Sequence, residues 1–296
     1  MLVNAAALAA IFTSFKSVFQ TAFEGAKPKW QAVATRVEST SSENNYGWLG
    51  SWPKMREWVG ERQVKNLEAH QYTIRNKDFE ATVAVDRNSI EDDQLGIYAP
   101  LVQSMADEAA TYPDAYVFDL LAKGFENKCY DGKPFFDTTH PEGRRKVANR
   151  TTAKLAGPAY DAARTAIMSR TNGEGKSLGL IPNLLVVAPD LEATARELLY
   201  ADQIAGTTNV RKGTAELLVV PELADYPGRW FLLCTTRPLK PLIFQERKKP
   251  KIVSMTNETD TAVFMNKKFI YGVDSRAAFG YGMWQMAYGS DGSEDK

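Results

Sequence analysis

The stretch YTIRNKDFEATVAVDR, residues 72–87, alternates apolar and polar side chains on both sides of a polar turn at residues 76–78. Alternation with a period of two is typical of β-strands that have one buried face. The two runs and the turn together predict a β-hairpin over residues 69–87. Because an isolated hairpin is only marginally stable in water, its apolar face must pack on its own core or on another chain. We expect this face to be an assembly interface, formed by Tyr72, Ile74, Phe79, Ala81, Val83 and Val85.

The segment before the hairpin is rich in tryptophan and irregular. Residues 26–58 sustain neither a helical nor a strand period, although residues 2–23 have the spacing of an amphipathic helix. Aromatic side chains on irregular chain must dock on something to leave water. Two readings stay open: an arm packed on its own domain, or an arm that reaches a neighbouring subunit. In the second reading the contact residues are Trp30, Trp48 and Trp52.

A long helix is expected after the hairpin. Apolar residues recur at spacings of three or four from Ile97 to Tyr112, and Asp92 and Asp93 suit the positive end of a helix start. Pro113 predicts a kink or a new start, and Gly124 can end the helix.

The second half of the chain predicts an α+β lobe. A helix should begin at Gly157, residues 184–187 should form a buried strand, and Asp190 should cap a helix that runs to Tyr200. Residues 201–214 read as a polar loop and residues 289–296 as a solvated tail. Further strands are expected at 215–220, 230–235, 242–246, 251–256, 260–265, 268–274 and 277–287.

The composition excludes several classes of protein. The 296 residues hold 36 basic and 36 acidic side chains, and this balance argues against a dedicated nucleic-acid binder. No apolar run approaches the roughly 20 residues that cross a bilayer. The two cysteines, Cys129 and Cys234, and the two histidines, His70 and His140, fit no zinc-site spacing and no disulfide framework. We expect a reduced, cytoplasmic protein without a membrane anchor.

The motifs that could carry chemistry have better structural explanations. Residues 175–177 resemble the end of a phosphate-binding loop, but Arg170 stands where that loop needs glycine. Gly280 and Gly282 suggest close packing in a strand rather than a dinucleotide site. The basic runs at 144–146 and 247–251 suit solvated faces, or contacts with an acidic surface of another subunit or with phosphate backbone. The sequence therefore predicts no catalytic, cofactor-binding or metal-binding residues.

Three functions remain. A hairpin and an arm repeated over many identical chains would interlock into a shell, because linked weak contacts raise the effective concentration for the next contact. A tail or decoration protein of a phage is a second reading. A cytoplasmic hydrolase with an Asp/Ser site in the second lobe is a third.

The order of the structural segments favours the shell. The chain resembles the major head subunit (T protein) family of Mu-like bacteriophages and prophages along essentially its whole length. The segments that carry the resemblance are 72–87, 90–98, 112–114, 120–125, 131–137, 184–192, 241–245 and 276–288.

The resemblance implies a Hong Kong 97-like capsid fold. Its parts would be an N-terminal arm at residues 1–58, an extended loop (the E-loop hairpin) at 59–91, a peripheral domain with a spine helix at 92–155, an axial domain at 156–241, returning peripheral strands at 242–288, and a flexible tail at 289–296.

The resemblance also implies partners and a location. Copies of the chain would form pentamers and hexamers of an icosahedral shell around double-stranded DNA, which they would contact non-specifically. A scaffolding protein, a portal and a maturation protease would be further partners. The protein would assemble in the bacterial cytoplasm and reside in the virion capsid. Some proteins of this fold join subunits through Lys and Asn side chains, but no spacing here singles out such a pair.

Overall fold

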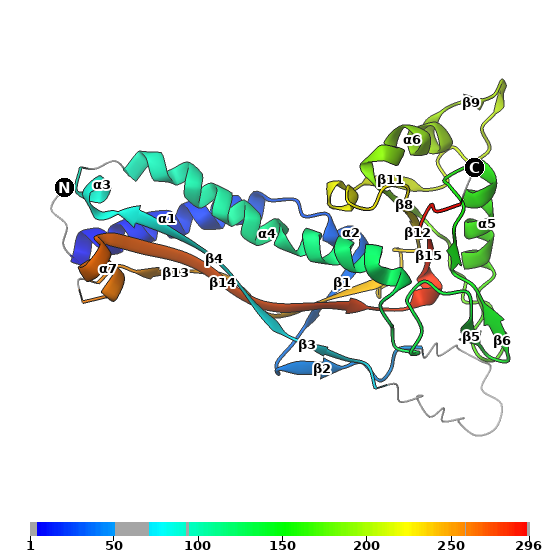
Figure 1. Cartoon of the computed structure of the whole chain (residues 1–296), viewed down its shortest axis with the longest axis horizontal. Coiled ribbons are helices and arrows are strands. Elements are labelled where there is room, and N and C mark those ends of the chain that lie inside the picture. Colours follow the sequence, from blue (N-terminus) through cyan, green and yellow to red (C-terminus); the bar gives the residue numbers. More distant parts are fainter. Residues whose placement is uncertain (1–4, 51–70, 93–94, 258, 295–296) are drawn as a thin grey trace.

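The computed structural model describes residues 5–50, 71–92, 95–257 and 259–294. Their helices and strands form two lobes of an elongated α+β molecule (Figure 1). The long lobe carries a four-stranded sheet in the order β1-β13-β14-β4, and the second lobe carries a five-stranded sheet in the order β11-β8-β12-β15-β7.

In the long lobe, two helices run along the sheet (Figure 1). Strand β1 is parallel to β13, whereas β13, β14 and β4 are antiparallel neighbours. The elements of this lobe are α1 (Ala5–Gly25), α2 (Trp30–Val33), β1 (Ala34–Glu38), β4 (Lys77–Asp86), α3 (Arg87–Glu91), η1 (Leu95–Tyr98), α4 (Ala99–Ala122), η2 (Lys123–Phe125), β13 (Leu242–Met255), α7 (Thr261–Asn266) and β14 (Lys268–Tyr281).

Helix α1 confirms the amphipathic helix predicted at the start of the chain. Leu8, Ile11, Phe15 and Phe19 are buried at spacings of three or four, and the residues between them are exposed or half-buried. Their face packs on α4, and it closes a small core with Val102, Met105, Val263, Phe269 and Tyr271, which we call the distal core.

The predicted hairpin at 69–87 is wrong. Strand β3 (Thr73–Arg75) pairs with β2 (Glu43–Asn45), whereas β4 pairs with β14 from Lys77 opposite Ala277 to Asp86 opposite Lys268. Asn76, the expected turn residue, binds residues 39–42 instead: its backbone N–H donates to the Ser42 carbonyl at 2.9 Å, and its side-chain amide donates to the Ser39 hydroxyl at 3.0 Å. Period two identifies strands but does not choose their partners, and β14 offers β4 a longer ladder.

Helix α4 begins at Ala99, not near Asp93. Pro100 lies in its first turn, which holds no acidic residue; Asp92 follows α3, and Asp93 lies outside the described residues. Pro113 lies inside the helix and does not end it. A proline within a helix costs about 3 kcal/mol, and burial of Pro113 together with Val117 and Phe118 in the next turn offsets that cost.

Several strand predictions for the return through the long lobe are corrected. The strands expected at 242–246 and 251–256 are one strand, β13, whose register shifts between Glu246 and Lys251, where Pro250 cannot donate a ladder hydrogen bond. Residues 260–265 fall in the helical turn α7, of which only Val263 is buried. The strands expected at 268–274 and 277–287 become β14, the turn η5 (Trp284–Met286) and part of β15.

The second lobe contains the predicted helix at Gly157 and the fully buried strand at 184–187. Its central strands β8 and β12 are antiparallel to each other. The elements are β5 (His140–Glu142), β6 (Arg145–Val147), β7 (Arg150–Thr151), α5 (Gly157–Met168), β8 (Leu184–Val187), η3 (Pro189–Leu191), α6 (Glu192–Tyr200), β9 (Gln203–Ile204), β10 (Thr207–Thr208), β11 (Glu216–Val219), η4 (Pro221–Leu223), β12 (Trp230–Leu233) and β15 (Ala287–Ser290).

Two predictions for this lobe are wrong. Asp190 does not cap α6, because Leu191 precedes the helix and the Asp190 carboxylate accepts a hydrogen bond from the Gly228 N–H at 2.9 Å. The tail does not begin at 289, because Gly289 and Ser290 belong to β15, which lies between β12 and β7. Strands β7 and β15 therefore bring residues from outside 156–241 into the sheet of the second lobe.

One larger core, which we call the main core, continues from the second lobe into the near half of the long lobe and includes Phe118, Phe136, Phe231 and Trp230. Close packing there explains the glycines of the last strands. A Cβ atom on Gly280 would lie 2.2 Å from Cδ1 of Ile74, and one on Gly282 would lie 2.7 Å from the Lys240 carbonyl oxygen. The packing expected for these two glycines is confirmed.

Candidate assembly surfaces

The predicted hairpin residues face the core of their own chain. Ile74 and Val85 are buried, Val83 packs on the distal core, and Phe79 packs on the main core. Tyr72 is half-buried, and its hydroxyl accepts a hydrogen bond from the Tyr281 N–H at 2.8 Å. These contacts account for the apolar alternation, and the role of this set between subunits, including half-buried Ala81, stays a prediction.

The three tryptophans proposed for the arm differ from one another. Trp30 is buried, and its ring centroid lies 4.5 Å from that of Phe244 on β13. Its backbone N–H and that of Lys29 both donate to the carboxylate of Asp114 on α4, at 2.6 and 2.9 Å. Trp48 is 41% exposed beside Tyr46. Trp52 lies outside the described residues. This part of the arm is therefore fastened to its own chain at Trp30 and leaves Trp48 on the surface.

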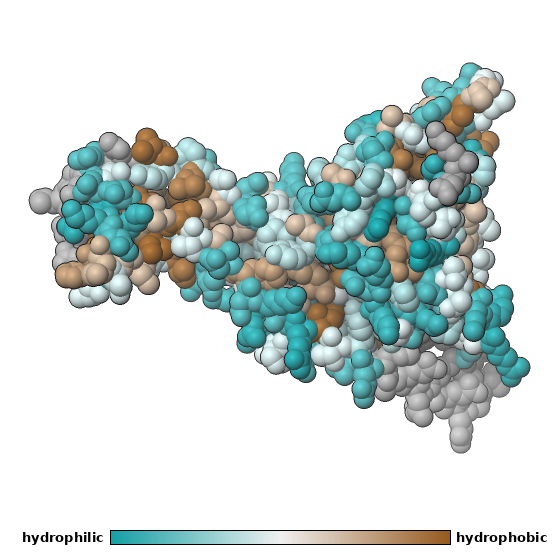
Figure 2. Space-filling view, in the orientation of Figure 1, coloured by the Kyte–Doolittle hydropathy of each residue, from teal (hydrophilic) through white to brown (hydrophobic). Residues whose placement is uncertain are grey.

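The far end of the long lobe exposes large hydrophobic side chains (Figure 2). On α7, Phe264 is 78% exposed and Met265 is 69% exposed. The end of β13 adds Val253 and Met255, and the turn η1 and the start of α4 add Ile97 and Leu101. Exposed apolar groups that gather in one region mark a site of contact with another molecule. Helical spacing in the sequence placed Ile97 and Leu101 on one stripe with the buried Met105, whereas the structure leaves both exposed.

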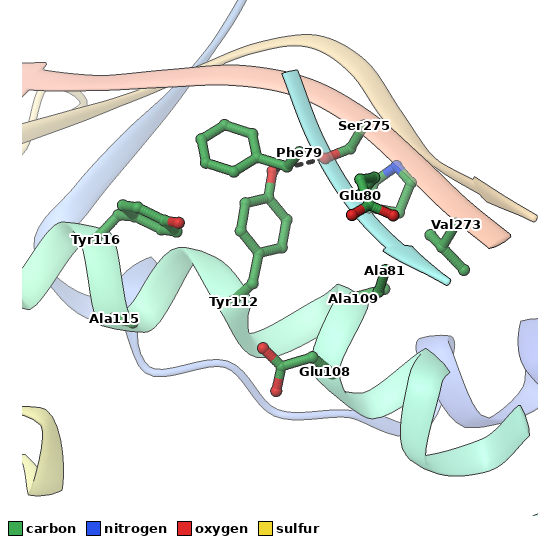
Figure 3. A pocket seen from close by; sticks show the side chains of 11 residues that line it. Phe79, Glu80, Ala81, Glu108, Ala109, Tyr112, Ala115, Tyr116, Val273 and Ser275 are labelled. Carbon is green, nitrogen blue, oxygen red and sulfur yellow. Dashed lines mark hydrogen bonds between the residues drawn. The ribbon is translucent and has the colours of Figure 1, made fainter. Parts of the chain in front are cut away.

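A groove on the long lobe lies between α4 and β4 (Figure 3). Its volume is about 280 Å³, and its lining is mostly aromatic and aliphatic. The rings of Tyr112 and Tyr116 lie 5.1 and 5.0 Å from the ring of Phe79, and the Ser275 hydroxyl donates to that of Tyr112 at 3.1 Å. We call this the aromatic groove, lined by Phe79, Glu80, Ala81, Glu108, Ala109, Tyr112, Ala115, Tyr116, Pro250, Val273 and Ser275.

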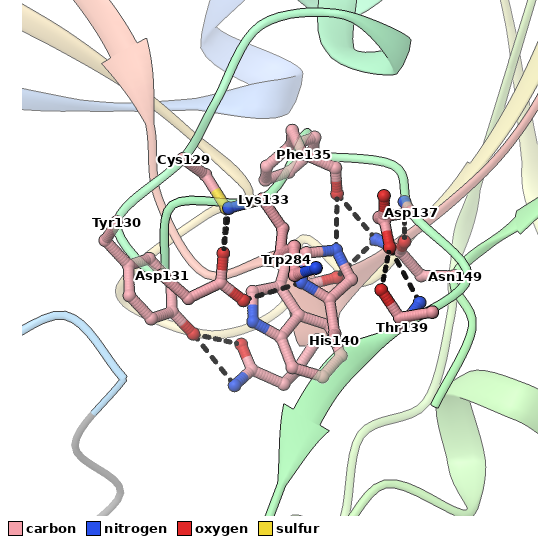
Figure 4. A network of polar contacts seen from close by, with 11 residues as sticks. Cys129, Tyr130, Asp131, Lys133, Phe135, Asp137, Thr139, His140, Asn149 and Trp284 are labelled. Carbon is pink, nitrogen blue, oxygen red and sulfur yellow. Dashed lines mark hydrogen bonds and ion pairs between the residues drawn. The ribbon is translucent and has the colours of Figure 1, made fainter. Parts of the chain in front are cut away.

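A buried polar network is the second feature that sequence spacing did not reveal (Figure 4). The carboxylate of Asp131 joins Cys129 to His140: the Cys129 thiol lies 3.2 Å from Oδ1, and Nδ1 of His140 lies 2.7 Å from Oδ2. Nε2 of His140 lies 3.2 Å from the Phe135 carbonyl oxygen, and its ring stacks on Trp284 at 4.1 Å.

The hydrogen-bonding atoms of this network have partners within the chain. In the described part of the chain, Cys129, Asp131 and His140 form a group with the residue types of a metal site, because one ligand-type atom of each lies within 4.8 Å of the others. Each of these atoms already has a hydrogen-bond partner, so no orphaned atom points to an ion. Burial, and next the charge of Asp131, raises the pKa of the Cys129 thiol, which stays protonated and is a poor nucleophile. The group therefore holds the loop after α4 against η5.

The pKa of Asp131 is lowered even though its carboxylate is buried. Burial by itself raises the pKa, but the hydrogen bond and the charge of His140 outweigh burial, with further help from the Lys133 N–H. Both ring nitrogens of His140 face acceptors, the Asp131 carboxylate and the Phe135 carbonyl oxygen. The contact between Asp131 and His140 is almost fully withdrawn from water.

No helix in the described part of the chain has both the length and the apolar character needed to span a bilayer.

The whole arrangement, with a spine helix beside a four-stranded sheet and a second lobe around a five-stranded sheet, defines the chain as a Hong Kong 97-like phage capsid protein. A chain in the procapsid of bacteriophage JBD30 superimposes with a TM-score of 0.66 and 37% sequence identity, over 99% of this chain and 77% of that one.

Sequence comparison gives the family. The chain belongs to the family described as Mu-like prophage major head subunit gpT, which it matches over residues 8–157, 143–223 and 224–295. It is 35% identical to the major capsid protein of Escherichia phage Mu over 97% of this chain and 74% of that protein. It is 32% identical to the Mu-like prophage FluMu major head subunit of Haemophilus influenzae over 96% of this chain and 72% of that protein.

Proposed function

We propose that many copies of this chain form pentamers and hexamers, which close into an icosahedral shell around double-stranded DNA, and that the chain has no catalytic activity of its own. The observation that carries this proposal is the family match from residue 8 to residue 295, which includes both lobes. The fold shared with a procapsid subunit supports the same conclusion.

The exposed apolar side chains support contacts at both ends of the molecule. Phe264 and Met265 lie at the far end of the long lobe, and Val210, which is 79% exposed, follows the small β9–β10 hairpin of the second lobe. A subunit with contact surfaces at both ends can join its neighbours into an extended lattice. A subunit with one such surface forms only a small oligomer.

We assign the parts of the fold with revised bounds. The pairing of β2 with β3 supports an extended loop whose described ends are residues 39–50 and 71–76, in place of the expected 59–91. The peripheral domain then comprises α4, β4, β13 and β14, and the axial domain comprises the second lobe with β7 and β15 included. Helix α1 and the segment to β1 form the N-terminal arm.

The proposed partners and location follow from the role of a head subunit. A scaffolding protein, a portal and a maturation protease are the expected partners, and assembly takes place in the bacterial cytoplasm before the subunit resides in the virion. The net charge of zero supports non-specific rather than tight contact with packaged DNA.

Electron microscopy of the purified chain tests the proposal. We expect closed particles of megadalton size, confirmed by light scattering, from the full chain at near-physiological salt. Open tubes, or binding only to preformed shells, would favour a tail or decoration protein. A single small oligomer that hydrolyses a test substrate would favour the hydrolase.

A further inference from the structure

The charged residues that line the aromatic groove are acidic. Glu80 on β4 and Glu108 on α4 line it, and both are exposed. Glu80 accepts a hydrogen bond from the Thr82 hydroxyl at 2.6 Å, and within the described residues neither carboxylate has a cationic partner. Helix α4 contains no lysine or arginine between Ala99 and Ala122. The groove therefore suits a segment that is apolar at its centre and positively charged at its edge.

The turn α7 has this character. Phe264 and Met265 point away from the distal core because Val263, one residue earlier, anchors the turn inside it. Lys267 and Lys268 follow after Asn266; both are exposed, and within the described residues neither pairs with an acid. We call the four residues Phe264, Met265, Lys267 and Lys268 the α7 tip.

The α7 tip cannot fill the groove of its own chain. It ends at Lys268, the first residue of β14, whereas the groove meets β14 at Val273 and Ser275. Five residues of strand span roughly 17 Å, and Val263 holds α7 at the far end of the lobe. A contact between tip and groove therefore requires two copies of the chain.

We propose that the α7 tip of one copy inserts Phe264 and Met265 into the aromatic groove of a neighbouring copy, with Lys267 and Lys268 beside Glu80 and Glu108. A volume of about 280 Å³ suits one or two large side chains, and a thioether packs favourably against aromatic rings. Tip and groove are different surfaces, so the contact is heterologous and can be repeated from copy to copy. This inference rests on the proposed shell function.

Photo-crosslinking in assembled particles tests the contact. Tyr116 is half exposed at the groove, so a Tyr116→p-benzoylphenylalanine variant places a reactive group there with little disturbance. Particles assembled from a mixture of nitrogen-14 and nitrogen-15 chains are irradiated, and the crosslinked peptides are identified by mass spectrometry. We expect mixed-isotope crosslinks to the peptide that contains residues 261–268. Crosslinks within one chain, or to any other segment or protein, overturn the proposal.

A charge exchange gives an independent test if position 116 does not tolerate the probe. We expect Glu108→Lys to slow assembly at least tenfold, Lys267→Glu to do the same, and the double variant to recover most of the rate. Asp107→Lys, at an exposed acidic residue of α4 that does not line the groove, is the matched control for the charge exchange and should leave the assembly rate unchanged. Equal defects in the single and double variants overturn the contact.

The two proposals fail in different ways. If the wild-type chain forms no particles, the shell function is wrong. If particles form but the crosslinks go elsewhere and the charge exchange gives no recovery, only the contact between tip and groove is wrong.

Discussion

At the scale of single residues, the contact between Asp131 and His140 is a buried electrostatic interaction. Its side chains are 4% and 0% exposed. Removal of one partner from such a pair typically costs about 3–5 kcal/mol, because the other is left buried without compensation. The pair connects the loop after α4 to Trp284, so we expect its loss to loosen the junction between the lobes.

We predict that Asp131→Asn lowers the free energy of unfolding by about 3 kcal/mol at pH 7, measured by urea denaturation. The pKa of Asp131 is lower in the folded chain than in the unfolded one. Its contribution is therefore complete above about pH 4, the unfolded value, and is lost as the pH falls through the lower folded value. The wild type should lose stability over that range, and the variant should lose less. If the free energy of unfolding fell equally with pH in the wild type and the variant, the lowered pKa of Asp131 would not contribute to stability.

The second prediction at this scale concerns Gly280. A methyl group there would lie 2.2 Å from Cδ1 of Ile74, and overpacking of this kind costs about 1–3 kcal/mol. We expect Gly280→Ala to lower the melting temperature and added Ile74→Val, which removes Cδ1, to restore part of the loss. Gly173→Ala is the matched control, because nothing lies within 4 Å of its added carbon. Equal shifts for both alanine variants would show that the cost does not come from this contact.

At the scale of elements, the same phenylalanine-to-aspartate change should affect stability at Phe79 on β4 and assembly at Phe264 on α7. Phe79 on β4 packs against Tyr112, Tyr116 and Phe279 within its own chain, whereas Phe264 on α7 is exposed. If Phe79 belonged only to an assembly interface, as the sequence pattern predicts, Phe79→Asp would give a folded but assembly-poor subunit. The packing of β4 on α4 changes that expectation.

We now predict that Phe79→Asp destabilises the subunit by about 2–4 kcal/mol, since it removes the ring contacts with Tyr112, Tyr116 and Phe279 and places a charge beside those rings. Phe264→Asp should change the free energy of unfolding by less than about 0.5 kcal/mol and yet reduce particle formation. Denaturation curves and light scattering measure the two properties separately. A stable Phe79→Asp subunit that fails to assemble would show that Phe79 acts between subunits and is not needed for the fold of its own chain.

At the scale of the whole molecule, the two cores divide the chain unequally. The main core spans both lobes and holds the fully buried strands β8 and β12, whereas the distal core closes the far end with α1 as one wall. Among the described residues, the hydroxyl of Tyr271 in the distal core is buried without a hydrogen-bond partner, as is Nε of Arg170 in the second lobe. The distal core is built from fewer buried side chains than the main core, so the far end should open more readily.

Hydrogen exchange with mass spectrometry checks this expectation. Amides of β8 and β12 should exchange only through global unfolding, and those of α1 and the far half of β4 should exchange earlier through local opening. The measurement uses unassembled subunits, because neighbours in a particle would cover the far end. Equal protection of α1 and β8 would mean that the two cores unfold as one unit.

The sequence by itself determined what depends on local pattern. Period two identified the strands at 72–75 and 79–86, helical spacing identified α1 and α4, and an unbroken apolar run identified β8, because these signals depend on neighbours a few residues apart. The order of such segments also carried the resemblance to head subunits. The packing expected for Gly280 and Gly282 came from the same local reading.

The tertiary structure alone decided which elements meet. The partners of β3 and β4 are 28 to 200 residues away in sequence. The helix continues through Pro113 because its next turn is buried, and Cys129, Asp131 and His140 come together only when their loop closes. The aromatic groove and the α7 tip are also features that only the folded chain brings together. Long-range pairing is chosen by competition among all the surfaces that a chain can bury, and no local period records its outcome.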